Sequence, residues 1–461
     1  MGRVMENLVT YPSTWGLGLI PKVRSLGLEA TLTEVSLYAS PVKVSFGPLS
    51  AWIVSDPDWM GYILCDNVSN YGKPNLVYDG FRMTVGSENL VVSSGSFWSA
   101  QRKLISPFFH RRAVTSMIEQ MVKIVDKYLH KWDQYADYGT TFNLDDELSA
   151  ITLRIILGTM LRDEFVSEAL YSKMQDAADY ITDNVEGLSY IMGSIFPWLL
   201  IPGKRRFSQQ AQVFRSIISS LVDRVDIGAQ YCGIDPTNLS LVEMLLLASD
   251  DDDDQPRINR EQLLSELIAI FMAGYETLAT TLSWLFGKYL PEMERNAQQS
   301  DLYGAFLNEC VLHPTPTDLS TGMATIGNFV NEVLRIAPAA PLTARYTLCD
   351  DEFQGISISA GTNILLYTFG LHRNGEYWEN PDKFDPTRFV RNDFPSGAFL
   401  PFSTGQRKYL GFDFALTEAK IIVSMLLSRY VVDVVDGNPA IKMGGILRPV
   451  KPFRVRLTSK V

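Results

Sequence analysis

The sequence predicts a predominantly helical α+β protein with a long central helix and small β-sheets. Strand-like alternation of apolar and polar residues is confined to two stretches, 40–60 and 341–368. The helical pattern, in which apolar residues recur every three or four positions, covers 111–136, 145–161, 164–190, 207–230 and 259–290. Because strands and helices do not alternate regularly along the chain, a parallel α/β sheet is not expected.

The first strand-like stretch is typical of a β-hairpin. Residues 42–46 alternate between apolar and polar side chains, Gly47 and Pro48 provide a turn, and 51–55 form a second strand. The second stretch returns late in the chain, and a further helix is expected over 412–430.

The composition is that of an ordinary globular protein. Of 461 residues, 46% are hydrophobic and 11% aromatic, enough to bury a large core in one domain or two. The formal net charge of -11 argues against a nucleic-acid-binding protein, which normally carries a basic domain or stripe. The four cysteines lie far apart, so neither a zinc site nor a disulfide framework is expected. We therefore expect a reducing compartment, and small molecules or proteins as partners.

The sequence offers little that would anchor it in a membrane. The N-terminus lacks the apolar core of a signal peptide, and no run of about twenty apolar residues predicts a spanning helix. The most membrane-like segment is 190–206, because 195–202 is largely apolar and Lys204, Arg205 and Arg206 follow it. This segment predicts either peripheral contact with a membrane or a buried loop that leads into a helix. The expected location is the cytoplasm, or the surface of the endoplasmic reticulum.

The central helix is predicted over 259–289, about 45 Å long at 1.5 Å per residue. Asn259 can cap its start together with Gln262, three residues on. Gly274 costs about 1 kcal/mol relative to alanine inside a helix, which indicates that something large approaches the backbone there. A tight crossing with another helix would also explain the glycine. It would not explain the neighbouring acid and alcohol, Glu276 and Thr277, in otherwise apolar surroundings.

Five motifs then stand in a defined order along the chain. They are Trp98-Ser-Ala-Gln-Arg102, Ala273-Gly-Tyr-Glu-Thr277, Glu332-Val-Leu-Arg335, the segment 372–389 that contains Arg388, and Phe402-Ser-Thr-Gly-Gln-Arg-Lys-Tyr409-Leu-Gly411. This ordered set resembles the cytochrome P450 family, and with the hairpin the resemblance covers nearly the whole chain. It implies the cytochrome P450 fold in a single domain over 1–461. The β-rich part would be 40–60 and 341–368, and the helical part 98–295 and 412–430.

The resemblance also gives roles to individual residues. In the family, the acid and the threonine of the central helix manage water and protons beside bound dioxygen, and here they are Glu276 and Thr277. A buried structural network that holds the following loop would consist of Glu332, Arg335 and Arg388. The contacts to the haem propionates would come from Trp98, Arg102, Arg345 and Arg407.

One position departs from the family's ligand loop, whose pattern is Phe-x-x-Gly-x-Arg-x-Cys-x-Gly. Tyr409 stands where the resemblance implies the cysteine that binds the haem iron. The monooxygenase reaction of the family needs a thiolate, because electron donation from sulfur helps to split dioxygen. A tyrosine oxygen reaches on the order of 4 Å farther from the backbone than a cysteine sulfur, so a loop at thiolate distance would drive the ring into the porphyrin. A phenolate can nevertheless ligate haem iron, as in catalase.

The sequence favours a haem-independent enzyme that catalyses a non-redox isomerisation, cyclisation or cycloaddition of an apolar secondary metabolite such as a terpenoid or polyketide. Such an enzyme would use no cofactor, no metal and no redox partner. Glu276, Thr277 and Tyr409 would be its catalytic groups, and the propionate-type arginines would hold a substrate carboxylate.

Two other functions stay open. The first alternative is a haem protein with Tyr409 as the iron ligand, acting as an oxygenase, a peroxide-dependent enzyme or a lyase. The retained arginines and Trp98 favour it. The second alternative is a catalytically silent relative that binds a ligand or another enzyme, which leaves the polar pair Glu276 and Thr277 unexplained.

Overall fold

The computed structural model describes residues 8–38, 40–74, 78, 81–82, 84–161, 166–185, 204–225, 239–247, 258–296, 300–436 and 440–460. The chain packs into two compact units. The first, called the sheet unit here, comprises Met1–Val77, Asn331–Tyr409 and Pro439–Lys451. The second, called the helical unit, comprises Tyr78–Val330, Leu410–Asn438 and Pro452–Val461. The single domain expected from the sequence stays a prediction.

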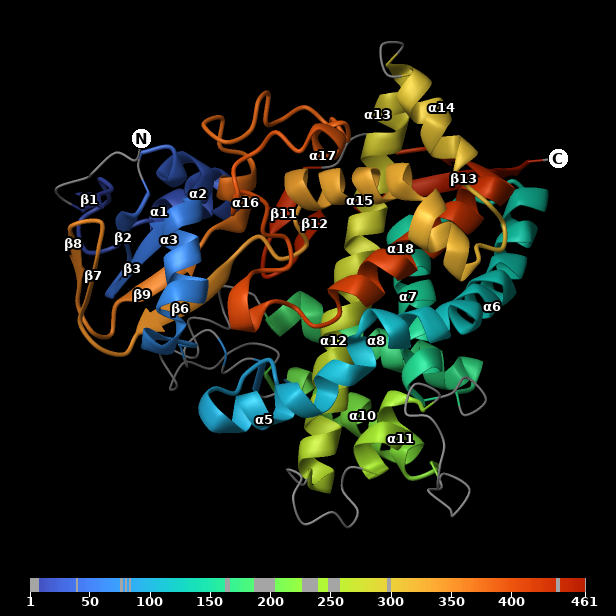
Figure 1. The fold of residues 1–461 in the computed structure, drawn as a ribbon, viewed down its shortest axis with the longest axis horizontal. Helices are drawn as coiled ribbons and strands as arrows, with labels where there is room; N and C mark the ends of the chain where they lie inside the picture. Colours follow the sequence, from blue (N-terminus) through green and yellow to red (C-terminus); the bar gives the residue numbers. More distant parts are fainter. Residues whose placement is uncertain are drawn as a thin grey trace. The chain divides into compact units, whose positions relative to one another are not determined.

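The sheet unit is built on a six-stranded sheet in the order β1-β2-β3-β9-β6-β4 (Figure 1). In that order the strands are Val9–Thr10, Val42–Phe46, Leu49–Val54, Asn363–Leu366, Thr343–Thr347 and Tyr71–Gly72. β2 and β3 pair antiparallel with Val44 opposite Ala51. Gly47 turns between them at a φ of +60°, which a residue without a Cβ adopts at little cost. The hairpin predicted from the sequence is therefore confirmed.

Shorter elements complete the sheet unit. Two small antiparallel pairs join β7 to β8 and β11 to β12, which are Asp351–Phe353, Ile356–Ile358, Ile441–Met443 and Leu447–Pro449. Its helices are α1 Ile20–Leu26, α2 Leu28–Ser36, α3 Pro57–Gly61, α16 Thr368–His372 and α17 Arg388–Arg391. α15 (Ala324–Ile336) begins in the helical unit and ends in the sheet unit. The core of the sheet unit includes the buried side chains Trp52, Val54, Trp59, Ile364 and Leu366.

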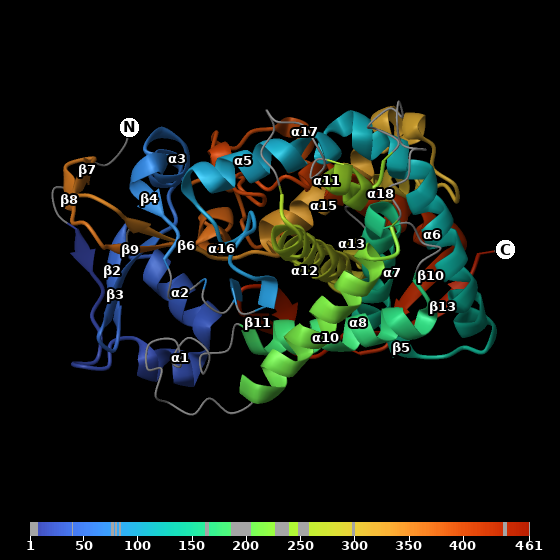
Figure 2. The same ribbon diagram turned by 90° about the horizontal axis from the view of Figure 1, so that it is seen from below.

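The helical unit is organised around α12 (Arg260–Trp284), as Figures 1 and 2 show. α7 (Leu144–Leu161) packs along α12, and α6 (Arg111–Asp137) packs on α7 and on α18 (Phe412–Arg429). The other helices of this unit include α5 Gly95–Ile105, α8 Glu168–Val185, α10 Lys204–Val222, α11 Leu241–Leu247 and α14 Ser300–Asn308. A three-stranded sheet in the order β10-β13-β5 belongs to the same unit and consists of Tyr430–Val434, Arg454–Ser459 and Phe142–Asn143. The predicted α+β class with predominant helix is confirmed.

The central helix begins as its sequence predicts. The Asn259 side chain accepts a hydrogen bond of 2.9 Å from the amide of Gln262, and the Gln262 side chain accepts one of 2.9 Å from the amide of Asn259. After α12 the helix continues through one π-helical turn (Leu285–Tyr289) into α13 (Leu290–Arg295), a helical run of 36 residues. Among the described residues, this run is the one helix long and apolar enough to cross a membrane. Since 72% of its most apolar window is buried inside the protein, it has the character of a core helix.

The membrane-like segment 190–206 lies mostly outside the described residues. Its last three residues, Lys204, Arg205 and Arg206, are described and form the first turn of α10. There the Arg206 guanidinium lies 4.5 Å from the centre of the Tyr180 ring. Peripheral membrane contact through this segment stays a prediction.

Replacing Asn259 by alanine should lower the free energy of unfolding by about 1 kcal/mol, because the amide of Gln262 loses its acceptor. Asn259→Ser keeps a side-chain oxygen at the same position and is the matched control, with a much smaller loss expected. Urea unfolding of both variants measures the difference. Equal losses would contradict a stabilising cap.

Candidate functional site

A buried ionic network in the sheet unit joins α15 to α17. Glu332 and Arg335 form two hydrogen bonds of 2.8 Å each, from Nε to Oε2 and from Nη2 to Oε1. Arg388 adds a third contact, with its Nε 3.3 Å from Oε1 of Glu332. The side chains of Glu332 and Arg335 are both 0% exposed, so each charge depends on its partner. The structure thus brings together the three residues that the sequence assigns to this network.

Arg335 also fixes the path of the chain between α16 and α17. Its Nη1 donates to the carbonyls of His372 and Pro381, at 2.8 and 2.7 Å. Its Nη2 donates to the carbonyl of Lys383 at 3.2 Å. The guanidinium also lies 5.2 Å from the centre of the Trp378 ring. One buried side chain therefore holds several turns of a segment that has little regular structure of its own.

His372 connects this segment to the chain that follows. Its ring is fully buried, and Nε2 accepts a hydrogen bond of 2.9 Å from the backbone amide of Leu400. Burial, assisted by the positive charge of Arg335, lowers the pKa of His372 to about 3. The imidazole is therefore neutral at physiological pH, and its hydrogen-bond pattern assigns the proton to Nδ1.

The loop 402–409 forms a tight turn. The amide of Tyr409 donates to the carbonyl of Phe402 at 2.9 Å. The two rings stack, with 6.3 Å between centroids and 12° between planes. Gly405 has a φ of +66°, and a Cβ there would lie 2.3 Å from the carbonyl oxygen of Leu64, so only glycine fits. Tyr409 is half-buried at the end of this turn.

A thiol that the sequence analysis overlooked lies beside the same loop. The Sγ atom of Cys65 is 3.7 Å from Oγ1 of Thr404. Cys65 is exposed and forms no disulfide. Because 339 positions separate Cys65 from Thr404 along the chain, no local sequence pattern could have linked the two.

Arg345 is a buried charge that has no carboxylate partner among the described residues. Its exposure is 5%, and its Nη1 donates to the carbonyl of Ala344 at 2.7 Å. Burying a guanidinium without a counter-charge is costly, so this position suits an anionic group of a ligand. Arg407, the other predicted arginine of the sheet unit, is half-buried on the 3-10 turn Gly405–Arg407.

Trp98 and Arg102 lie one turn apart on α5 in the helical unit. The Arg102 guanidinium is 5.4 Å from the centre of the Trp98 ring. Burial lowers the pKa of Arg102, but arginine stays protonated in proteins. The pair therefore presents a partly desolvated positive charge beside an aromatic surface.

One face of α12 is only partly buried at its middle. In the run from Leu263 to Gly287, the residues that are not buried are Ile270, Met272, Ala273, Gly274 and Thr277. They lie around the glycine at which the sequence predicts a close approach. Thr277 donates from Oγ1 to the carbonyl of Ala273 at 2.9 Å, and Glu276 is 6% exposed. Sequence reasoning missed Ile270 and Met272, because an apolar residue in an apolar helix gives no signal of its own.

The candidate residues divide between the two units. Those of the sheet unit are Tyr409, Arg345, Arg407 and the three network residues. Those of the helical unit are Trp98, Arg102, Glu276 and Thr277. A common site lined by both sets stays a prediction.

The family model for cytochrome P450 matches residues 14–457. The chain belongs to the cytochrome P450 family. Pentalenene oxygenase from Streptomyces avermitilis is 26% identical, over 93% of this chain and 92% of its own length. Cyclooctat-9-en-7-ol 5-monooxygenase from Streptomyces melanosporofaciens is 26% identical, over 88% and 85%. Protein LUTEIN DEFICIENT 5, chloroplastic, from Arabidopsis thaliana is 26% identical, over 96% and 76%.

A solved structure agrees with this assignment of the fold. The crystal structure of the cytochrome P450DA heme domain superimposes with a TM-score of 0.81, over 98% of this chain and 97% of that one. Since only 18% of the residues are identical, this likeness shows the fold alone. The cytochrome P450 fold expected from the sequence is confirmed.

Membership of this family corrects the expectation of an enzyme without a cofactor, because cytochromes P450 bind haem. Three features of this chain fit a haem. The buried guanidinium of Arg345, which has no carboxylate partner among the described residues, suits a propionate. The face of α12 around Gly274 is partly exposed, and the phenol oxygen of Tyr409 belongs to a residue type that can bind haem iron. The expectation was wrong because it relied on the length of the Tyr409 side chain, whereas the family assignment relies on residues 14–457.

Replacing Glu332 by glutamine should destabilise the protein by about 3–5 kcal/mol, because two buried guanidinium groups lose their counter-charge. The matched control is Asp382→Asn, which removes the carboxylate from a pair with Arg373 in which Asp382 is 80% exposed. That change should cost less than about 1 kcal/mol. Chemical unfolding measures both, and similar losses would contradict a dominant role for the buried network.

The stability of the protein should fall at acidic pH in a way that depends on His372. Its folded-state pKa is about 3 against an ordinary value of 6.5, so between these values the unfolded chain binds a proton that the folded chain does not. The stabilisation is complete above pH 6.5 and is lost as the pH falls toward 3. His372→Gln keeps an acceptor for the Leu400 amide, and its slope should be shallower by up to about 1.4 kcal/mol per pH unit. Thermal unfolding across this range tests the difference, and parallel curves would rule out His372 as its source.

Proposed function

We propose that this chain is a haem-dependent oxygenase of a small apolar terpenoid, with Tyr409 as the protein ligand of the iron. The observation that carries the proposal is the family match over 14–457. This range includes the two segments that resemble the oxygen-activation segment and the ligand loop of the family, 273–277 and 402–411. Across 402–411 the loop departs from the family pattern only at the ligand position.

The proposed chemistry depends on Tyr409 as the ligand of the iron. An unperturbed tyrosine has a pKa near 10, so binding to iron has to enforce its ionisation. Arg407, two positions before it, would favour the phenolate through its positive charge. A haem bound in this way supplies one-electron and dioxygen chemistry.

The propionates of the haem would be held by the cationic residues that the family pattern marks. Arg345 is the strongest candidate, because its buried guanidinium has no carboxylate partner in the described part of the chain. Arg102, Arg407 and Trp98 would complete the set. Guanidinium groups suit this task, since their fork of N–H donors matches a carboxylate.

Glu276 and Thr277 would manage protons at the partly buried face of α12. The Thr277 hydroxyl already donates to the carbonyl of Ala273, which leaves its oxygen free to accept a hydrogen bond from water or substrate. The side chain of Glu276 is largely removed from water, with 6% of the residue exposed. The pair would therefore hold a proton close to the position where the substrate is transformed.

The names of the relatives support the proposed substrate class. Two of them are described as oxygenases of pentalenene and of cyclooctat-9-en-7-ol, and a third as a carotene epsilon-monooxygenase. We propose a substrate of the same apolar terpenoid kind; a carboxylate on it stays a prediction. An oxygenase takes electrons from a redox partner or uses peroxide. The proposed oxygenase therefore replaces the haem-independent enzyme, which would need neither of them. A cytoplasmic or membrane-peripheral location also stays a prediction.

The proposal is tested by the spectrum of the purified protein reconstituted with haem. The full chain should bind about one haem, and Tyr409→Phe should weaken haem binding roughly tenfold or more, because phenylalanine offers iron no ligand atom. Tyr409→Cys should shift the spectrum of the carbonyl complex to the form typical of thiolate ligation. Circular dichroism of each variant confirms that it is folded.

Cys65→Ser is the matched control, because Cys65 is the thiol that lies beside the loop. Its spectrum should equal that of the wild type. If Cys65→Ser loses the haem and Tyr409→Phe does not, the iron ligand is the sulfur of Cys65. If the reconstituted protein converts a terpenoid only to a product of unchanged mass, the reaction is an isomerisation or cyclisation and the oxygenase proposal fails.

A further inference from the structure

A hydrogen bond joins α7 to the backbone of α12 at the segment that resembles the oxygen-activation segment of the family. Thr152 on α7 is fully buried, and its Oγ1 lies 2.8 Å from the carbonyl oxygen of Tyr275 on α12. The carbonyl oxygens of Leu148 and Ser149, in the same helix as Thr152, are farther away, at 3.0 and 3.1 Å. A hydroxyl has one hydrogen to donate, and Tyr275 offers the shortest contact. The geometry therefore favours the bond that joins the two helices.

Thr277 leaves α12 on the side opposite to the Tyr275 side chain. Two residues correspond to about 200° of rotation in an α-helix. Burial agrees with this, since Tyr275 is 0% exposed and Thr277 belongs to the partly buried face. The Thr277 hydroxyl donates to the carbonyl of Ala273 at 2.9 Å, so its direction follows the backbone of this turn. A shift or rotation of α12 at Tyr275 would therefore move the Thr277 hydroxyl with it.

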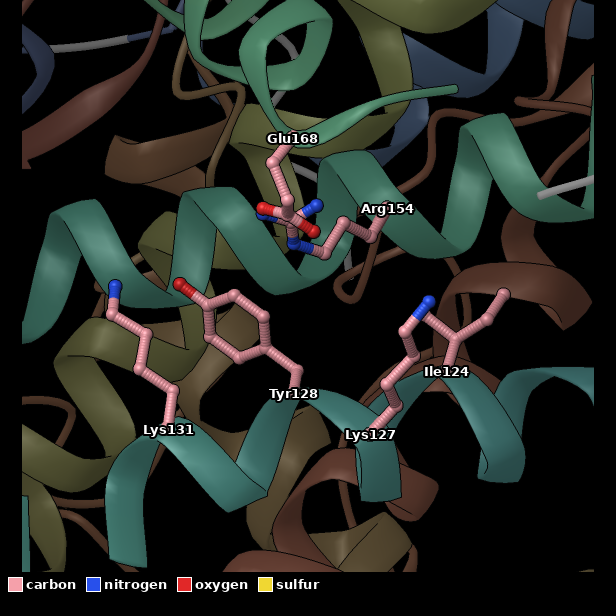
Figure 3. Close-up of a pocket in the computed structure, with 6 residues that line it drawn as sticks. All are labelled: Ile124, Lys127, Tyr128, Lys131, Arg154 and Glu168. Carbon is pink, nitrogen blue, oxygen red and sulfur yellow. The ribbon is translucent and has the colours of Figure 1, made fainter. Parts of the chain in front are cut away.

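α7 is itself anchored to two neighbouring helices through Arg154, two residues after Thr152. The Arg154 guanidinium lies 5.0 Å from the centre of the Tyr128 ring on α6 and 4.1 Å from that of the Tyr171 ring on α8. It also pairs with Glu168, the first residue of α8. Figure 3 shows Arg154 and Glu168 above the Tyr128 ring, where residues of α6, α7 and α8 line a cavity of about 270 Å³. Thr152 is therefore presented to α12 by a helix that is held in place on another side.

We propose that Thr152 is a positioning residue, which fixes the backbone of α12 at Tyr275 and thereby the place of Glu276 and Thr277 in the oxygenase reaction. The inference rests on the proposed function, because there these two residues manage protons. A displacement of about 1 Å in a group that takes part in a reaction can lower the rate about a hundredfold. No local sequence pattern marks Thr152, since 123 positions separate it from Tyr275.

Amide hydrogen exchange in the purified full chain, followed by mass spectrometry of peptides, tests the hold on α12 without substrate or turnover. Thr152→Val keeps the shape of the side chain and removes the hydroxyl, so the amides of 275–280 should exchange roughly fivefold faster than in the wild type. Thr152→Ser keeps the hydroxyl and should exchange as the wild type does.

Thr159→Val is the matched control, because Thr159 is a buried threonine on the same helix. Its hydroxyl contacts the carbonyls of Ile155 and Ile156, which belong to α7 itself. The loss of this hydroxyl should leave exchange in α12 unchanged. If Thr152→Val and Thr159→Val exchange alike over 275–280, the proposal is overturned.

Conversion of pentalenene with hydrogen peroxide by the haem-reconstituted protein tests the effect on the reaction. Pentalenene is the terpenoid in the name of one relative. Thr152→Val should lower kcat roughly tenfold and leave the KM for pentalenene nearly unchanged, because Thr152 acts through α12. Thr152→Ser should restore kcat, and Thr159→Val should keep the kcat of the wild type. An unchanged kcat in Thr152→Val, or the same loss in Thr159→Val, would refute a positioning role.

The two measurements separate this inference from the proposed function. If the wild type leaves pentalenene unchanged while exchange in α12 depends on the Thr152 hydroxyl, the proposed function fails and the hold of Thr152 on α12 is supported. If the wild type oxygenates pentalenene and Thr152→Val behaves as Thr159→Val does, the proposed function stands and Thr152 has no positioning role.

Discussion

The carboxylate of Glu332 is the centre on which the sheet unit depends. Removed from water, it is shared by the guanidinium groups of Arg335 and Arg388, and Arg335 in turn anchors the carbonyls of the irregular segment that follows α16. His372 extends this chain of contacts to the amide of Leu400, just before the turn that presents Tyr409. A buried charge has to keep its partners, because water cannot solvate it. The network therefore restricts the irregular segment between α16 and α17 to one conformation.

Two arginines outside that network are incompletely paired with carboxylates. Arg345 is buried with a backbone carbonyl as its acceptor, and Arg154 is held between two tyrosine rings with an exposed carboxylate on one edge. In both cases the described part of the chain fixes a guanidinium without supplying a buried counter-charge. We propose that the guanidinium of Arg345 binds a haem propionate.

A tyrosine at the position that resembles the ligand position of the family would change the chemistry more than the fold. A single residue cannot outweigh a family match that spans 14–457, and the expectation of a cofactor-free enzyme failed for that reason. The length of a tyrosine side chain excludes haem only if the loop is held at the distance that suits a cysteine sulfur. The sequence does not determine the distance between the loop and the iron. It determines which ligand atoms are present, and a phenol oxygen can bind haem iron.

The sequence by itself determined the elements whose causes are local. The capping box at Asn259 and the hairpin turn at Gly47 follow from residues only a few positions apart, and the order of the motifs determined the family. Only the tertiary structure placed Cys65 beside Thr404 and formed the cavity around Arg154. It also buried Arg345 with a backbone carbonyl as its acceptor and with no carboxylate partner among the residues that the structure describes. The reason is physical. Periodicity and capping depend on residues that are close together in the sequence, whereas burial and charge pairing depend on which distant segments pack together. Contacts between distant segments produce no periodic pattern in the sequence.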